Sequence, residues 1–149
     1  MKRGFFLIII FFAFLLESKI SVFGARPNLT VAIAYYLGLK NGEGKGLIFG
    51  AMIGIIGDSL SGGVIGPNML GKGLAGFFAA LMSGSFFRWT PLLGIIGIAS
   101  LTVFDGIIVF VSRAVFEHMP TSVPNAIFIT LISAAINSVS GAFIKPKDD

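Results

Sequence analysis

The amino-acid sequence predicts an all-α integral membrane protein, folded as a compact bundle of six transmembrane helices. Two observations carry this prediction. The chain of 149 residues is 55% hydrophobic and only 12% charged, about half the charged fraction of an ordinary soluble domain, and its mean hydropathy is +0.94. Its apolar residues fall into six runs separated by short polar or Gly- and Pro-containing segments, as expected for successive membrane-spanning helices.

The first two runs differ in length. Residues 4–23 are long enough to cross a bilayer. They also follow a basic N-terminus as a cleaved signal peptide would, but the only plausible cleavage site places Phe23 where a small residue is needed, so an uncleaved helix is expected. Residues 28–40 follow Pro27, a residue favoured at helix starts. The apolar part of this run reaches only about 16 Å, and the bundle has five spanning helices if it does not cross.

A row of glycines marks the third run, residues 46–62. From Gly42 to Gly66 every fourth residue is glycine, except that Asp58 occupies one of these positions. A step of four residues over-rotates an α-helix by about 40°, so the row winds slowly around the helix. This smooth face suits a close crossing with a neighbouring helix.

The last three runs carry small or polar residues on one face. Residues 69–87 present a face of Gly76, Ala79, Ala80, Ser83 and Gly84. Residues 91–112 contain Asp105. Residues 124–144 present a stripe expected to face other helices, formed by Thr130, Ser133, Asn137, Ser140 and Gly141.

Charge predicts the orientation and excludes some functions. With six crossings, seven of the 11 basic residues lie on the side of the N-terminus and four on the other, so the positive-inside rule places both termini in the cytoplasm. The basic residues are scattered and form no patch for nucleic acid. With 0 Cys in the chain, no disulfide, thiolate metal site or cysteine nucleophile can form.

Three ionisable residues, Asp58, Lys72 and Asp105, are expected at membrane depth, where each must be buried and paired. Asp58 and Lys72 are equally distant from Ile65, the presumed centre of a helical hairpin, which predicts an ion pair between them. The alternative is that Asp58 caps the backbone around Gly62 and Gly63.

Asp105 has two interpretations. The first is a hydrogen bond to the last helix, at Thr130 or Asn137. The second is a role in a proton or cation relay.

Enzymatic motifs are not found. The Gly-x-Gly-Asp signature of intramembrane aspartyl proteases would need glycine at position 55, which is Ile55. His118 has no second histidine or cysteine to complete a metal site, and Lys72 lacks the spacing and the hydroxyl of a phosphate-binding loop. No cofactor is expected.

One region resembles a known family. Arg26-Pro27-Asn28-Leu29 and then Asp58, Gly62, Gly66 and Leu70 are similar in order and distance to the Arg-Pro-Asp-Leu and Asp-x-x-x-Gly-x-x-x-Gly-x-x-Ala-Leu motifs of the MreD family of rod shape-determining proteins. Asn28 stands where an aspartate is usual. The motifs cover about positions 26 to 70, and length and helix count extend the resemblance to the whole chain.

The resemblance implies a non-enzymatic, multi-pass scaffold in the bacterial cytoplasmic (inner) membrane. Its expected partners are MreC, RodA with its transpeptidase, and the MreB filament, within the machinery that organises peptidoglycan synthesis at the lateral wall. Self-association into a homodimer is left open. The structural or interface residues expected are Arg26, Pro27, Asp58, Gly62, Gly66, Asn68, Lys72, Asp105 and Asn137.

The same resemblance supplies an alternative function. The MreD family is similar in fold to the S components of energy-coupling-factor transporters, six-helix proteins that bind vitamins. In that case Arg26, Lys72, Arg113 and Glu117 would line an outward-facing ligand site.

Overall fold

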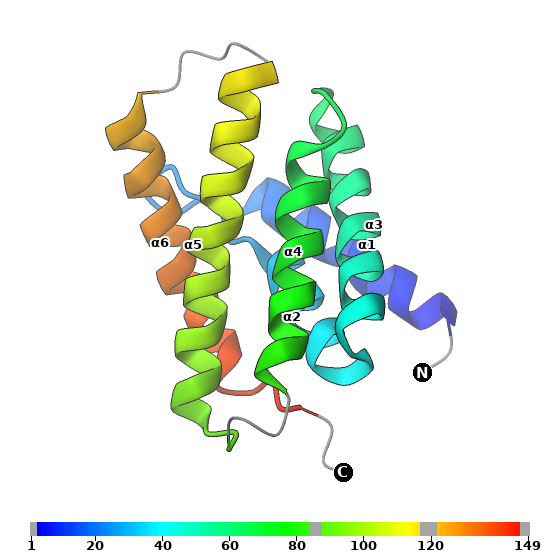
Figure 1. Cartoon of the computed structure of the whole chain (residues 1–149). Coiled ribbons are helices and arrows are strands. Elements are labelled where there is room, and N and C mark those ends of the chain that lie inside the picture. Colours follow the sequence, from blue (N-terminus) through cyan, green and yellow to red (C-terminus); the bar gives the residue numbers. More distant parts are fainter. Residues whose placement is uncertain (1–2, 84–87, 117–121, 147–149) are drawn as a thin grey trace.

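A computed structural model describes residues 3–83, 88–116 and 122–146, and these residues form α-helices joined by short connections (Figure 1). The all-α class is therefore confirmed. The helices are α1 (Arg3–Lys19), α2 (Leu29–Asn41), α3 (Glu43–Ser61), α4 (Pro67–Met82), α5 (Pro91–Phe116) and α6 (Val123–Gly141). In this view α6, α5, α4 and α3 stand side by side, whereas α1 runs obliquely behind them.

The connections explain where the observed helix ends differ from the expected ones. α1 stops at Lys19 rather than at residue 23, because Phe23 and Gly24 have positive φ angles of 51° and 83° and form a tight turn closed by the Val22–Ala25 bridge. α3 begins at Glu43 rather than at residue 46, because Gly42 alone, with φ of 84°, connects it to α2.

Three further helix boundaries differ from those expected from the sequence. Pro67 lies in the first turn of α4, where its missing N–H needs no partner, so this proline begins α4. α5 runs to Phe116 rather than to residue 112. α6 ends at Gly141 rather than at residue 144. Residues 84–87, expected to end the fourth helix, lie outside the described residues.

The antiparallel pair of α3 and α4 makes the most extensive contact in the fold. A methyl group added at Gly50 would overlap the carbonyl group of Lys72, and one at Gly54 would overlap that of Asn68. The glycine row therefore lies directly against the backbone of α4, the close approach that small residues permit between membrane helices. The row is used for packing inside the bundle.

Glycines also bring the other helices together. Gly38 of α2 lies against the Gly76 carbonyl of α4, and Gly94 of α5 and Gly141 of α6 lie against each other. The polar stripe of α6 faces inward as predicted, with Ser133, Asn137 and Gly141 buried. α2, α4 and α5 enclose the main hydrophobic cluster, formed by Val31, Ala32, Tyr35, Leu39, Ala75, Ala79, Ile98 and Leu101.

The outer surface is strongly apolar. Large side chains such as Phe12 on α1, Ile107 on α5 and Leu131 on α6 are each more than half exposed, at 56%, 54% and 55%. Among the described residues, α5 and α6 are long and apolar enough to cross a membrane. A bilayer accommodates such a surface without cost, whereas water does not.

Candidate functional site

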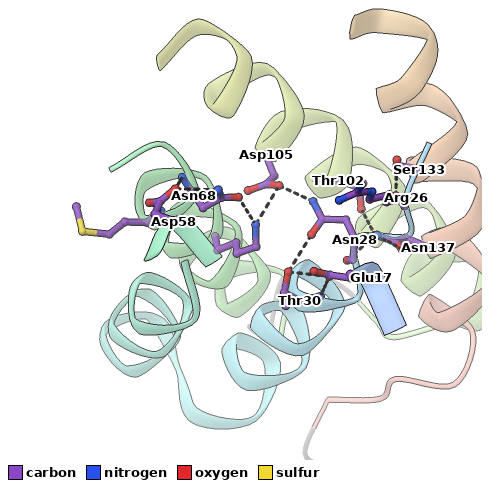
Figure 2. Close-up of polar contacts among 12 residues, drawn as sticks. Glu17, Arg26, Asn28, Thr30, Asp58, Asn68, Thr102, Asp105, Ser133 and Asn137 are labelled. Carbon is purple, nitrogen blue, oxygen red and sulfur yellow. Dashed lines mark hydrogen bonds and ion pairs between the residues drawn. The ribbon is translucent and has the colours of Figure 1, made fainter. Parts of the chain in front are cut away.

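Polar side chains from all six helices meet inside the bundle (Figure 2). Their contacts form one connected set, beside which Ser133 bonds to the backbone of Arg26, two residues before Asn28. Buried polar groups are costly in an apolar surrounding unless they are paired. The polar network, as it is called below, consists of Glu17, Arg26, Asn28, Thr30, Asp58, Asn68, Lys72, Thr102, Asp105, Ser133 and Asn137.

Asp58 is buried near the end of α3 and caps the start of α4. Its Oδ2 atom accepts hydrogen bonds from the backbone N–H groups of Gly66 (2.8 Å) and Met69 (3.1 Å). Its Oδ1 atom accepts from the backbone and side-chain amides of Asn68, at 3.0 and 2.8 Å. The first N–H groups of a helix lack partners within the helix and form the positive end of its dipole. Asp58 therefore caps backbone, but at the start of α4 and not around Gly62 and Gly63, where the alternative placed the cap.

Asp58 and Lys72 do not form the expected ion pair. The Asn68 side chain lies between them, since it donates to Asp58 and accepts a hydrogen bond of 2.7 Å from Lys72 Nζ. The expectation centred the hairpin on Ile65. The glycine contacts instead place Lys72 level with Gly50, which is eight residues and about 12 Å along α3 from Asp58.

Lys72 pairs instead with Asp105 of α5. The distance from Lys72 Nζ to Asp105 Oδ2 is 3.8 Å, and the two side chains are 4% and 1% exposed. Asp105 Oδ2 also accepts a hydrogen bond of 2.7 Å from Asn28 Nδ2. The expected hydrogen bond from Asp105 to Thr130 or Asn137 is therefore wrong, because Asn28 takes that place between α5 and α6.

Asn137 holds the segment before α2 against α6. Its side-chain amide pairs with the backbone of Asn28, accepting from the N–H group at 3.1 Å and donating to the carbonyl at 2.7 Å. It also donates to Thr102 Oγ1 at 3.2 Å. One turn away, Ser133 Oγ donates to the Arg26 carbonyl at 2.8 Å. These bonds fix the segment's backbone and thereby aim Asn28 at Asp105.

Glu17 is a member that the sequence analysis did not identify. It is only partly exposed and accepts hydrogen bonds from the Thr30 N–H group (2.6 Å) and Thr30 Oγ1 (2.9 Å). Asn28 precedes α2 without capping it through its side chain, so α1 supplies the cap. The one available signal was a lone acidic residue at the end of an apolar helix.

The structure thus brings together Asp58, Asn68, Lys72, Asp105 and Asn137. The remaining expected residues have structural positions. Arg26 contributes its carbonyl and has an exposed side chain, and Pro27 is buried beside it. Gly62 and Gly66 shape the α3–α4 turn with φ angles of 68° and 150°, which glycine adopts readily.

Two hollows adjoin the polar network. A cavity of about 300 Å³ lies between α5 and α6, and a groove of about 830 Å³ lies between α1 and the ends of α3 and α4. They share five lining residues, Asn28, Asn68, Arg113, Ile129 and Ser133. We refer to the two together as the joined cavity.

The geometry does not match the catalytic sites considered from the sequence. Asp58 binds backbone amides, whereas Asp105 binds Lys72 and Asn28, so the two carboxylates do not share a proton as an aspartyl-protease pair does. Within the described residues, no three His, Asp or Glu side chains gather as a metal site would require. His118 and Glu117 lie outside the described residues.

Comparison with protein families identifies the chain. The family model described as rod shape-determining protein MreD matches residues 2–138 of the 149-residue chain. The chain belongs to the MreD family. Searches of curated proteins and of solved structures gave no match. The resemblance seen in the sequence is therefore confirmed, and the match does not support the alternative of a vitamin-binding S component.

Membership gives this MreD protein a role in rod shape determination and a membrane location. All the residues of the polar network lie within the matched range.

Proposed function

We propose that this MreD protein is a non-catalytic membrane scaffold of the cell-elongation machinery, which binds MreC and helps to organise peptidoglycan synthesis at the lateral wall. The observation that carries the proposal is the bonding of Asp58, whose two carboxylate oxygens accept four hydrogen bonds from the start of α4. An acid bound in this way holds two helices together. RodA, its transpeptidase partner and the MreB filament complete the proposed assembly.

The proposed location is the cytoplasmic membrane, crossed several times, with both termini in the cytoplasm. In Figure 1 the C-terminal end of α6 lies at the same end of the bundle as the turn between α2 and α3, and the turn between α3 and α4 lies at the opposite end. The positive-inside count favours the end that holds the α2–α3 turn as the cytoplasmic one.

The packing of the glycine row inside the bundle restricts the surfaces to which MreC can bind. The small-residue faces of α3 and α4 are occupied by each other and by α2, so a transmembrane helix of MreC has to pack on lipid-facing surface outside them. Large exposed apolar side chains on α1, α5 and α6 supply that surface.

Photo-crosslinking in cells tests this proposal. A photoreactive residue placed at Phe12, Ile107 or Leu131, which lie on three different helices, is expected to give a covalent adduct with MreC from at least one position. A probe at Ala79, buried between helices at 0% exposure, is the control and should give none. Adducts with lipid or unrelated proteins only, from all three exposed positions, would argue against MreC binding through the membrane.

A further inference from the structure

The joined cavity has one apolar flank that opens sideways between helices. Ile10, Phe11 and Phe14 of α1 line it on one side, and Ile56 and Leu60 of α3 line it on the other. Phe11 and Leu60 are 60% and 68% exposed, so this flank is continuous with the surface that faces lipid. A ligand held here can extend a hydrocarbon chain into the bilayer.

The opposite flank of the joined cavity is cationic. Three basic residues, Arg26, Lys72 and Arg113, line it together with two acidic ones, Glu17 and Asp105, which leaves a formal charge of +1 among the described lining residues. Glu17 already accepts two hydrogen bonds from Thr30, so its charge is partly compensated. The described lining residues therefore favour an anion over a cation.

Two buried groups in this flank have unused bonding capacity. Lys72 Nζ has three N–H donors, but among the described residues it makes one hydrogen bond, to Asn68, and the 3.8 Å ion pair with Asp105. The Oδ1 atom of Asp105 has no hydrogen-bond partner in the described part of the chain. A ligand that offers both an acceptor oxygen and a hydroxyl donor would satisfy both groups, and buried groups of this kind are normally satisfied.

We propose that the joined cavity binds the phosphodiester headgroup of an anionic membrane lipid. The phosphate oxygens accept from Lys72 and Arg113, a headgroup hydroxyl donates to Asp105, and the chains follow the flank between α1 and α3. A phosphodiester carries a single negative charge, which suits a lining with more basic than acidic side chains among the described residues. A volume of about 830 Å³ is within the range of small-ligand sites.

The test uses the purified full-length chain, delipidated and returned to nanodiscs that contain phosphatidylglycerol or phosphatidylcholine. Native mass spectrometry measures the lipid that stays bound. Phosphatidylglycerol is expected to be retained about tenfold more tightly, because its headgroup hydroxyl can donate to the Asp105 carboxylate whereas choline has no hydroxyl, and a hydrogen bond to a charged group is worth about 1.5–3 kcal/mol. Glycerophosphoglycerol, the same headgroup without acyl chains, is added as a soluble competitor and should displace phosphatidylglycerol only weakly.

Three variants test the position of the site. Arg113→Gln and Arg26→Gln should each lower phosphatidylglycerol retention several-fold. Gly57→Leu should lower it without changing charge, since a side chain at Gly57 enters the groove beside Phe14. Lys45→Gln is the matched control, because Lys45 is exposed in the first turn of α3, far from the cavity, and retention should not change. Arg26 is exposed, so Arg26→Gln gives a result even where Arg113→Gln does not fold.

Three results would overturn the proposal. The first is equal retention of the two lipids. The second is that Arg113→Gln, Arg26→Gln and Gly57→Leu all retain as much phosphatidylglycerol as Lys45→Gln does. The third is binding of glycerophosphoglycerol as tight as that of the lipid, which would assign the site to a free phosphodiester instead.

Discussion

Lys72 of α4 and Asp105 of α5 form an ion pair inside the bundle, with 3.8 Å between Nζ and Oδ2 and almost no exposure of either side chain. A charge at this depth is costly without its partner. The pair therefore fixes α4 against α5, and through Asn28 it also fixes the segment before α2.

The first prediction concerns this pair. Lys72→Met should destabilise the protein by about 3–5 kcal/mol, because it leaves Asp105 buried without its counter-charge. Adding Asp105→Leu should recover part of the loss. Unfolding in detergent micelles, analysed as a double-mutant cycle, should give a coupling energy of about 1–3 kcal/mol between the two positions. Strict additivity of the two changes would disprove the pairing.

The glycine row gives a second prediction with an internal control. Gly50→Ala should lower the unfolding temperature strongly, because the new methyl group overlaps the Lys72 carbonyl, which is backbone and cannot move aside. Gly44→Ala adds the same group in the same helix where nothing lies within 4 Å. It should be stabilising by about 0.5–1 kcal/mol. Similar effects of the two changes in thermal unfolding would be inconsistent with the packing of α3 on α4.

The third prediction concerns the Asp58 cap. Asp58→Ala removes four hydrogen bonds to the start of α4 and should cost about 2 kcal/mol or more, at the upper end for a lost helix cap. Asp58→Asn keeps one acceptor oxygen and should cost less. Ser59→Ala is the control, because among the described residues the Ser59 hydroxyl bonds only to the Ile55 carbonyl one turn earlier. A loss no greater for Asp58→Ala than for Ser59→Ala would contradict the cap.

A fourth prediction tests how α1 is attached. Glu17→Ala should remove the hydrogen bond of 2.6 Å that the Thr30 amide donates to Glu17. Hydrogen exchange at the Thr30 amide should then become faster, by about tenfold for each 1.4 kcal/mol by which the free energy of local opening falls. Ser18→Ala is the neighbouring control, since the Ser18 hydroxyl donates to the Leu15 carbonyl within α1, its only hydrogen bond in the described part of the chain. Unchanged exchange at Thr30 in Glu17→Ala would mean that α1 does not cap α2.

The sequence was sufficient for the features that depend on local periodicity. The glycine row and the stripe through Asn137 repeat at helical spacing, and each predicted an inward face because small and polar residues on membrane helices avoid lipid. The need to bury and pair Asp58, Lys72 and Asp105 follows from the cost of charge in the bilayer.

The choice of partners was not predictable, because it depends on register and on an irregular segment. The contact of Gly50 with Lys72 shifts the hairpin away from the symmetric arrangement that would have paired Lys72 with Asp58. Asn28 reaches Asp105 only because the turn at Phe23 and Gly24 brings the chain back between α5 and α6. Neither has a periodic signal in the sequence.

Depletion of this MreD protein in its own host tests the central claim most directly. Cell width and the incorporation of a fluorescent D-amino acid along the side wall are measured as the protein is lost, with wild-type complementation as the control. A scaffold of cell elongation predicts rounding and loss of side-wall incorporation, both reversed by complementation. Cells that keep their shape and their lateral incorporation after the protein has disappeared would contradict the account.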